Sequence, residues 1–213
     1  MKRLLSLLVI IMIMNNMNAQ ELKSIALNPP DKTRGLTIMQ AFGNRASATA
    51  FTSEKLKLQD LSDLLWAANG INRPELKKRT APSAMNAQDI DLYVFMAEGV
   101  YLYNATGSTL EPVVSGDQRL LAAGRQTDVA NASVILVMVS DISKFQGEDK
   151  TSKLSIAAMD AGLVSQNISI FCAGVGLSTR PRATMDQVKL REILKLKDSQ
   201  YPLLNNPVSY PVK

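Results

Sequence analysis

The stretch ASVILVMV, residues 132–139, is a continuous run of apolar and small residues. A strand with one face in water alternates polar and apolar side chains, whereas an unbroken apolar run is typical of a strand covered on both faces. The run therefore predicts a strand at the centre of a sheet, and the other elements are assigned outward from it.

Periodic elements precede and follow this run. Before it, the spacing predicts a helix over 56–68 that stops at Gly70, a β-hairpin formed by 91–96 and 100–104, and a short helix over 118–123. After it, the pattern predicts a helix over 153–164, a second apolar strand over 168–175, a last helix over 185–196 and an extended tail over 201–212. This order fits an α+β fold in which helices pack on a mainly antiparallel sheet.

The chain divides into three regions. Residues 1–19 have the order of a secretory signal peptide, with a basic start, a short apolar run and a small residue at the expected cleavage point. The apolar run is too short for a bilayer span, which needs about 20 such residues, so we expect an exported protein, periplasmic or extracellular, rather than one held by a membrane anchor. Residues 20–35 are expected to form a polar lead-in, because Pro29 and Pro30 disfavour a helix. Ordered structure is expected to start near Leu36, with one domain over 36–213.

Composition excludes several kinds of chemistry. The 213-residue chain has no histidine and a single cysteine, Cys172. It therefore has no Ser-His or Cys-His nucleophile pair, no histidine-ligated metal and no disulfide within the chain. The net charge of +5 falls by two when residues 1–19 are removed, which is too weak a positive charge to argue for a nucleic-acid partner. The segment 71–83, with two prolines and four basic residues, is predicted to be a loop.

Three separated segments carry a resemblance to a known family. They are Asn44-Arg45-Ala46-Ser47 with the later Leu64-Leu65-Trp66-Ala67-Ala68-Asn69-Gly70; Pro82-Ser83-Ala84-Met85-Asn86-Ala87-Gln88; and Gly176-Leu177-Ser178-Thr179-Arg180-Pro181-Arg182-Ala183-Thr184. Together they resemble the FMN-dependent nitroreductase superfamily, in particular its short forms related to the SagB-type oxidoreductases. The resemblance runs from about Leu36 to the C-terminus. It implies the nitroreductase-like fold with an extended C-terminal tail, FMN as cofactor, and a homodimer with FMN at its interface, which the tail 201–212 would help to form by packing across the partner.

The resemblance also assigns the first segment to the FMN phosphate. Arg45, Ala46 and Ser47 would bind it, and a guanidinium with a hydroxyl suits a group that carries nearly two negative charges. If this segment is helical, Arg45 and Ser47 would have to flank the phosphate rather than share a face. A surface arginine beside a helix serine remains the alternative.

The other two segments are assigned to the flavin ring. The resemblance places Pro82, Ser83, Ala84 and Asn86 around the ring, while Ser83 could also cap a helix start. It places Pro181, Arg182, Ala183 and Thr184 opposite flavin N5, where the family uses backbone donors. The resemblance thus implies an exported FMN-dependent oxidoreductase that transfers hydride through N5 to or from a small substrate. The flavin performs the chemistry, so no catalytic side chain and no metal site are assigned.

Several positions depart from the family pattern. Thr49 stands where a basic residue is frequent, and Ser178, Thr184 and Ser209 stand where glycine is frequent. These departures keep open an alternative, a degenerate flavin-fold protein that binds a ligand or a partner without catalysis. Asp89 and Asp91, at the start of a predicted strand, are expected to be solvated acids.

Overall fold

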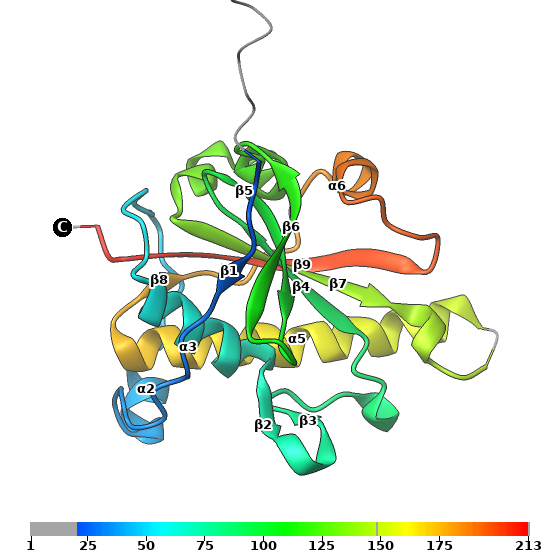
Figure 1. Cartoon of the computed structure of the whole chain (residues 1–213), viewed down its shortest axis with the longest axis horizontal. Helices are drawn as coiled ribbons and strands as arrows, with labels where there is room; N and C mark the ends of the chain where they lie inside the picture. The colour runs from blue at the N-terminus through cyan, green and yellow to red at the C-terminus, as the bar shows by residue number, and fades with distance from the viewer. Residues whose placement is uncertain (1–20, 148, 213) are drawn as a thin grey trace, which may run out of the picture.

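The structure, a computed structural model, describes residues 21–147 and 149–212, so the predicted signal segment 1–19 lies outside it. Within the described residues, one seven-stranded sheet has the order β1-β6-β5-β4-β7-β9-β8, and neighbouring strands are antiparallel throughout. The strands are β1 (Ile25–Ala26), β4 (Ile90–Phe95), β5 (Gly99–Asn104), β6 (Thr109–Ser115), β7 (Val134–Asp141), β8 (Ser178–Thr179) and β9 (Gln200–Ser209). The α+β prediction with a mainly antiparallel sheet is confirmed (Figure 1).

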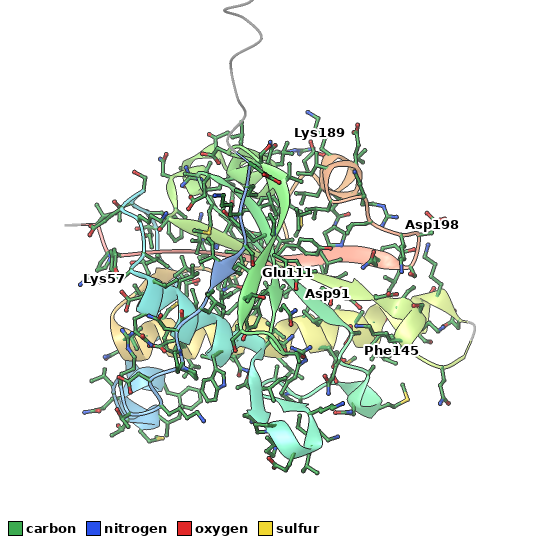
Figure 2. All side chains as sticks on the ribbon, in the orientation of Figure 1. Lys57, Asp91, Glu111, Phe145, Lys189 and Asp198 are labelled. Atoms are coloured by element: carbon green, nitrogen blue, oxygen red, sulfur yellow. The ribbon has the colours of Figure 1, made fainter. Side chains whose placement is uncertain are left out.

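Helices cover both faces of this sheet (Figure 1). They are α2 (Ile38–Asn44), α3 (Leu58–Asn69), α4 (Arg119–Ala123), α5 (Lys150–Val175) and α6 (Gln187–Ile193), and short 3-10 turns lie at η1 (Pro74–Leu76), η2 (Ala84–Asn86), η3 (Thr127–Asn131) and η4 (Ile142–Lys144). The predicted helices near 56–68 and 118–123 are confirmed as α3 and α4, and the last helix is shorter than the expected 185–196. Charged side chains such as Lys57, Lys189 and Asp198 lie at the periphery (Figure 2).

Strand β7 is buried on both of its faces, as the run 132–139 predicts. Its side chains alternate: Leu136 and Met138 join the core with α3 and α5, whereas Ile135 and Val137 join the core with α4 and α6. Because successive side chains of a strand point to opposite faces, an unbroken apolar run is what two helical layers require. The central position of β7 follows directly from this burial.

Helix α5 corrects the prediction of a helix over 153–164 followed by a strand over 168–175. It is continuous for 26 residues, from the N-cap Asp149, whose carboxylate accepts from Thr151 and Ser152, to Gly176 at φ 77°. Its buried side chains recur at helical spacing, at Ala157, Ala161, Val164, Ile168 and Cys172. The local run 168–175 resembles a strand, but its burial against α3 and the sheet follows the 3.6-residue period of a helix. This helix is also long and apolar enough to cross a membrane by composition alone, and its packing in the core explains that composition.

The described part of the expected lead-in, 21–35, belongs to the folded domain. Ile25 pairs with Leu110 of β6, and Leu22, Ile25 and Leu27 pack against the core. The Arg34 guanidinium bridges Asp60 (2.7 Å) and Asp63 (2.8 Å) of α3. The expectation that ordered structure starts near Leu36 is therefore wrong, because two prolines exclude a helix but leave an extended edge strand possible.

The C-terminal tail also differs from the expectation. Residues 200–209 form β9, which pairs with β7 and β8 inside the sheet of its own chain. The Tyr210 hydroxyl accepts from the Lys57 amide and donates to Asp60. The segment expected to be an extended tail is therefore, over residues 200–209, a strand in the sheet of its own chain.

The segment 71–83 contains more structure than a loop. Strands β2 (Ile71–Arg73) and β3 (Lys78–Arg79) form a small second sheet, closed by Lys77 at φ 50°. The predicted hairpin at 91–96 and 100–104 is confirmed as β4 and β5. Its Gly99 is required by a close approach, because a Cβ there would lie 2.5 Å from the Val114 carbonyl oxygen.

Leu136→Ala should lower the free energy of unfolding by about 2–5 kcal/mol, because it leaves a cavity at the fully buried sheet centre. Leu120→Ala removes the same atoms at a side chain that is 56% exposed and should change it by less than about 1 kcal/mol. Urea unfolding of both variants checks this, and equal losses would contradict the assignment of the core.

Candidate functional site

The first and third resemblance segments meet beside strand β8. The Ala48 amide donates to the Thr179 carbonyl (2.9 Å), which joins the chain after α2 to the chain after α5. A hollow of about 180 Å³, named here the α2–β8 hollow, is lined by Asn44, Ala46, Ser47, Ala48, Ser169, Ala173, Leu177, Ser178 and Thr179. Ala46 and Ser47 therefore lie beside Ser178 and Thr179, directly before the loop 181–184 that is predicted to face flavin N5.

Arg45 and Ser47 do not lie in a helix. Helix α2 ends at Asn44, and Arg45 has the extended dihedrals φ −61° and ψ 117°, so the helical geometry considered from the sequence does not apply. Both residues are exposed. Neither side chain has a hydrogen-bond or ion-pair partner within residues 21–147 and 149–212, so a guanidinium and a hydroxyl are free to bind an anion at the rim and wall of the α2–β8 hollow.

The second segment, 82–88, forms a strained turn. Met85, Asn86 and Gln88 have φ of 52°, 55° and 47°, a region that residues other than glycine rarely adopt. The Ser83 hydroxyl accepts from the Gln88 amide (2.9 Å), and the Asp160 carboxylate accepts from the Ala84 amide (2.9 Å). Ser83 thus closes the turn instead of capping a helix, since η2 has no side-chain cap bond. Strain of this kind persists only where surrounding contacts fix it.

One chain does not bring this turn to the α2–β8 hollow. The turn is held by Asp160, whereas the hollow is lined by Ser169 and Ala173 of the same helix. At about 1.5 Å of rise per residue, these anchor points lie roughly 14–20 Å apart along α5. In Figure 1, α2 and β8 accordingly lie at the C-terminal end of α5, away from η2.

The Arg182 backbone and side chain are both occupied within the protein. Its amide donates to the Asn205 carbonyl (2.9 Å) and its carbonyl accepts from the Asn205 amide (2.7 Å). Its buried guanidinium donates to Gln126 (2.8 Å), to the Asn205 side chain (2.8 Å) and to the Ala123 carbonyl (2.7 Å). Burial lowers the pKa of this guanidinium, and Arg180 lowers it further. Arg182 therefore fixes the loop and is not itself a free donor, which corrects its assignment, whereas Pro181, Ala183 and Thr184 remain exposed.

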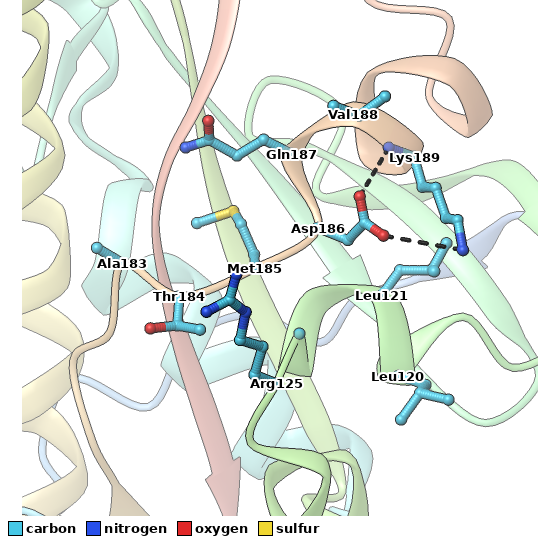
Figure 3. Close-up of a pocket in the computed structure, with 11 residues that line it drawn as sticks. Leu120, Leu121, Arg125, Ala183, Thr184, Met185, Asp186, Gln187, Val188 and Lys189 are labelled. Atoms are coloured by element: carbon cyan, nitrogen blue, oxygen red, sulfur yellow. Dashed lines mark hydrogen bonds and ion pairs between the residues drawn. The ribbon is translucent and has the colours of Figure 1, made fainter.

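A second hollow adjoins these exposed residues. It measures about 830 Å³ and lies between the end of α4 and the start of α6 (Figure 3). Ala183 and Thr184 form part of its wall, so the predicted N5 loop faces open space on this side. This space is named here the α4–α6 hollow.

Comparisons with known proteins agree with this arrangement. The family model described as the nitroreductase family matches residues 43–208. A protein of Methanocaldococcus jannaschii named as a nitroreductase is 29% identical over 178 residues, which cover 79% of this chain and 88% of the relative. A crystal structure of a nitroreductase-type protein from Ralstonia eutropha has a TM-score of 0.84 at 29% identity, covering 91% of this chain and 92% of that one.

This chain belongs to the nitroreductase family. Structures of lower identity share its fold: an NAD(P)H:FMN oxidoreductase from Staphylococcus epidermidis has a TM-score of 0.64 at 12% identity and covers 87% of this chain and 92% of its own. The family assignment supports an oxidoreductase. The resemblance seen in the three sequence segments is confirmed at the level of the family and the fold.

Sequence reasoning on this nitroreductase-family chain missed the acid pair beneath the strained turn. Asp89 is fully buried rather than solvated, and its carboxyl accepts from the Ser140 hydroxyl. Burial first, and the neighbouring Asp160 second, raise the pKa of Asp89 to about 6. Asp91 is half-buried, and burial raises its pKa as well. One feature of the sequence could have indicated that Asp89 is buried. Asp89 lies between the turn and β4, where its side chain points into the sheet.

Arg180 is a second residue that the motif analysis left unassigned. Its Nε is buried without a hydrogen-bond partner among the described residues. Its guanidinium lies 5.7 Å from the centre of the Phe51 ring and 3.9 Å from Asp128. Arg180 directly follows β8, but its guanidinium is directed to Phe51 and Asp128, neither of which lines the α2–β8 hollow.

The free energy of unfolding of the natural chain should fall as pH rises from about 4 to 6, and Asp89→Asn should remove this fall. In that window the folded chain retains a proton on Asp89 that the unfolded chain has released, so the free energy of unfolding falls as pH rises. Urea unfolding at several pH values should give a flatter profile for Asp89→Asn. Glu111→Gln, at an exposed acid on β6, is the control, and a profile for Asp89→Asn that matches that of the natural chain would contradict this role.

Proposed function

We propose that this nitroreductase-family protein is an FMN-dependent oxidoreductase whose flavin site is completed by a second copy of the chain. The observation that carries the proposal is the bond from Ala48 to Thr179. It joins a segment with a free guanidinium and hydroxyl to a loop in which Pro181, Ala183 and Thr184 are exposed, at one open surface of the molecule.

The residues present fit a flavin phosphate. Arg45 and Ser47 are exposed, and neither side chain has a partner within residues 21–147 and 149–212. Charge-assisted hydrogen bonds from a guanidinium and a hydroxyl are a favourable donor set for a phosphate dianion. The exposed Thr49 supplies no charge, so Arg45 is the charged donor of this set.

In this proposal the chain supplies binding and placement. FMN, when bound, supplies the hydride chemistry of the reaction. Arg45 and Ser47 bind its phosphate, and the loop from Pro181 to Thr184 lies beside its ring, with Arg182 holding that loop in shape through Asn205 and α4.

Asn86 reaches the same flavin only from a partner chain. Exposed apolar side chains extend from α2, where Phe42 is 53% exposed, along Met159 (67%) and Leu163 (41%) of α5 to Met85 (66%). An isologous dimer buries the same patch on both subunits. Two α5 helices packed antiparallel about a point near residue 166 would bring the strained turn of each chain opposite the α2–β8 hollow of the other.

Export to the periplasm or the extracellular space is part of the proposal and rests on residues 1–19. Nicotinamide cofactors reside in the cytoplasm, so an exported enzyme would take its electrons from another reductant or oxidise its substrate directly. The substrate is a small molecule, and the α4–α6 hollow offers the space for it.

The purified protein, incubated with FMN and desalted, should retain about one flavin per chain, with absorbance bands that bleach on anaerobic reduction. Arg45→Gln should weaken FMN binding about 10-fold to 100-fold, because it removes a charge-assisted bond to the phosphate. The variant should bind riboflavin, which has no phosphate, as the natural chain does. Fluorescence titration with both flavins measures this.

Arg73→Gln is the matched control, since Arg73 is an exposed arginine on the β2–β3 hairpin, and its FMN affinity should be unchanged. A folded protein that stays colourless with excess FMN would contradict the proposal. It would favour the degenerate flavin fold that binds a ligand or partner without catalysis.

Leu163→Glu should convert the dimer to a monomer and lower FMN retention, because it places a charge in the centre of the apolar patch. Val113→Glu changes a side chain of nearly equal exposure (39%) on β6, outside this patch, and should leave the dimer intact. Light scattering after size-exclusion chromatography measures the mass of each. A dimeric Leu163→Glu variant with full flavin content would refute the antiparallel α5 arrangement.

A further inference from the structure

The α4–α6 hollow is built on two fixed backbone positions that flank Arg125. Gly124 has φ +60°, and a Cβ there would lie 3.0 Å from the Met185 Cα, so only glycine fits easily between α4 and the loop. On the other side, Gln126 is held by the Arg182 guanidinium (2.8 Å). Arg125 therefore projects from a short turn whose two ends are tied to the predicted N5 loop.

Arg125 is the uncompensated charge of this hollow. Lys189 also lines it, but its ammonium lies 3.9 Å from Asp186, whose carboxylate also caps α6. Arg125 has no hydrogen-bond or ion-pair partner in the part of the chain that the structure describes. Figure 3 shows its side chain directed toward Thr184 and Met185, whereas Lys189 is turned toward Asp186.

The remaining wall is mixed: Thr184, Asp186 and Gln187 line it together with four large apolar side chains. Leu121 and Met185 are half-buried, and Leu120 and Val188 are exposed at the rim. A hollow that combines apolar side chains with a few convergent polar groups is the usual form of a small-molecule site. The apolar side chains suit an apolar body and the free Arg125 suits one negative group, whereas the Asp186 carboxylate in the same wall disfavours a polyanion.

We infer that the α4–α6 hollow binds a small organic anion with an apolar body, and that Arg125 pairs with its carboxylate beside Ala183 and Thr184. This inference rests on the proposed function, because it makes the anion the substrate that lies next to the flavin ring. A guanidinium binds a carboxylate through two parallel N–H···O bonds. The carboxylate therefore orients the ligand, and the apolar side chains of the hollow, such as Leu121 and Met185, hold its body near the loop.

The test is calorimetric titration with benzoate and with benzamide, its neutral analogue, on the protein with and without FMN. Benzoate should bind the natural chain more tightly than benzamide does. Arg125→Gln should weaken benzoate binding about 10-fold to 100-fold and leave benzamide unchanged, because the lost interaction is a charge-assisted one. Arg125→Lys, which keeps the charge but not the planar fork, should lie between the two.

Two controls have the same change of charge. Lys189→Gln, within the hollow, should weaken benzoate binding by less than about threefold, because Asp186 already compensates that ammonium. Arg73→Gln, at the exposed hairpin, should have no effect. Thermal unfolding of each variant should match the natural chain, since Arg125 has no partner to lose within the described residues.

The outcomes separate this inference from the proposed function. Equal binding of benzoate by the natural chain and Arg125→Gln overturns the inference, whatever the flavin content. Loss of FMN in Arg125→Gln without a change in benzoate binding also overturns it, because Arg125 then serves the cofactor. A protein that never binds FMN but binds benzoate through Arg125 refutes the FMN proposal and retains the anion site.

Discussion

The unbroken α5 helix is the constraint on which the rest of the molecule depends. Its stripe of small and apolar side chains, from Ala157 to Cys172, fills the space under the sheet and lets α2 and α3 pack closely on it. At its C-terminal end, the Gly174 carbonyl accepts from the Leu36 amide, and a Cβ on Gly174 would lie in ordinary contact with Ala41. Because a helix has a fixed rise, α5 holds the strained turn and the α2–β8 hollow at a set separation. A flavin site that uses both elements then has to draw them from two chains.

The strained turn shows how the fold maintains an unfavourable backbone. Three residues with positive φ would relax in a free peptide. In the protein, Asp160 holds the Ala84 amide, Arg79 donates to the Gln88 side chain, and Lys144 donates to the Gln88 carbonyl. The buried Asp89 lies beneath these contacts, and its raised pKa reflects first its own burial and then the neighbouring Asp160 carboxyl. The free energy of unfolding is thus lower than apolar residues at these two buried positions would give. The turn holds the exposed Asn86 in one conformation at the surface.

The sequence predicts those features that depend on burial periodicity or on a local motif. Side-chain spacing alone predicts the strand at 132–139, the helix ending at Gly70 and the hairpin at 91–104 that lies between them. The three motif segments identify the family. Prediction fails where tertiary contacts override a local pattern: Ile168–Val175 looks like a strand but continues α5, and the lead-in pairs with β6 despite its prolines. The separation of the flavin segments within one chain is likewise a property of α5 length and packing. No motif records it.

Arg125 and Arg182 illustrate the same limit at the level of single residues. Both are arginines near the predicted N5 loop, and the motif singled out Arg182. The structure reverses their roles, because Arg182 uses its guanidinium on Gln126, Asn205 and the end of α4, whereas Arg125 faces the α4–α6 hollow. The buried arginine is what makes the exposed one usable, since it fixes Gln126 and so the backbone from which Arg125 projects. Substitution of Arg182 should therefore disturb the proposed anion site through the loop, because its guanidinium is used within the protein.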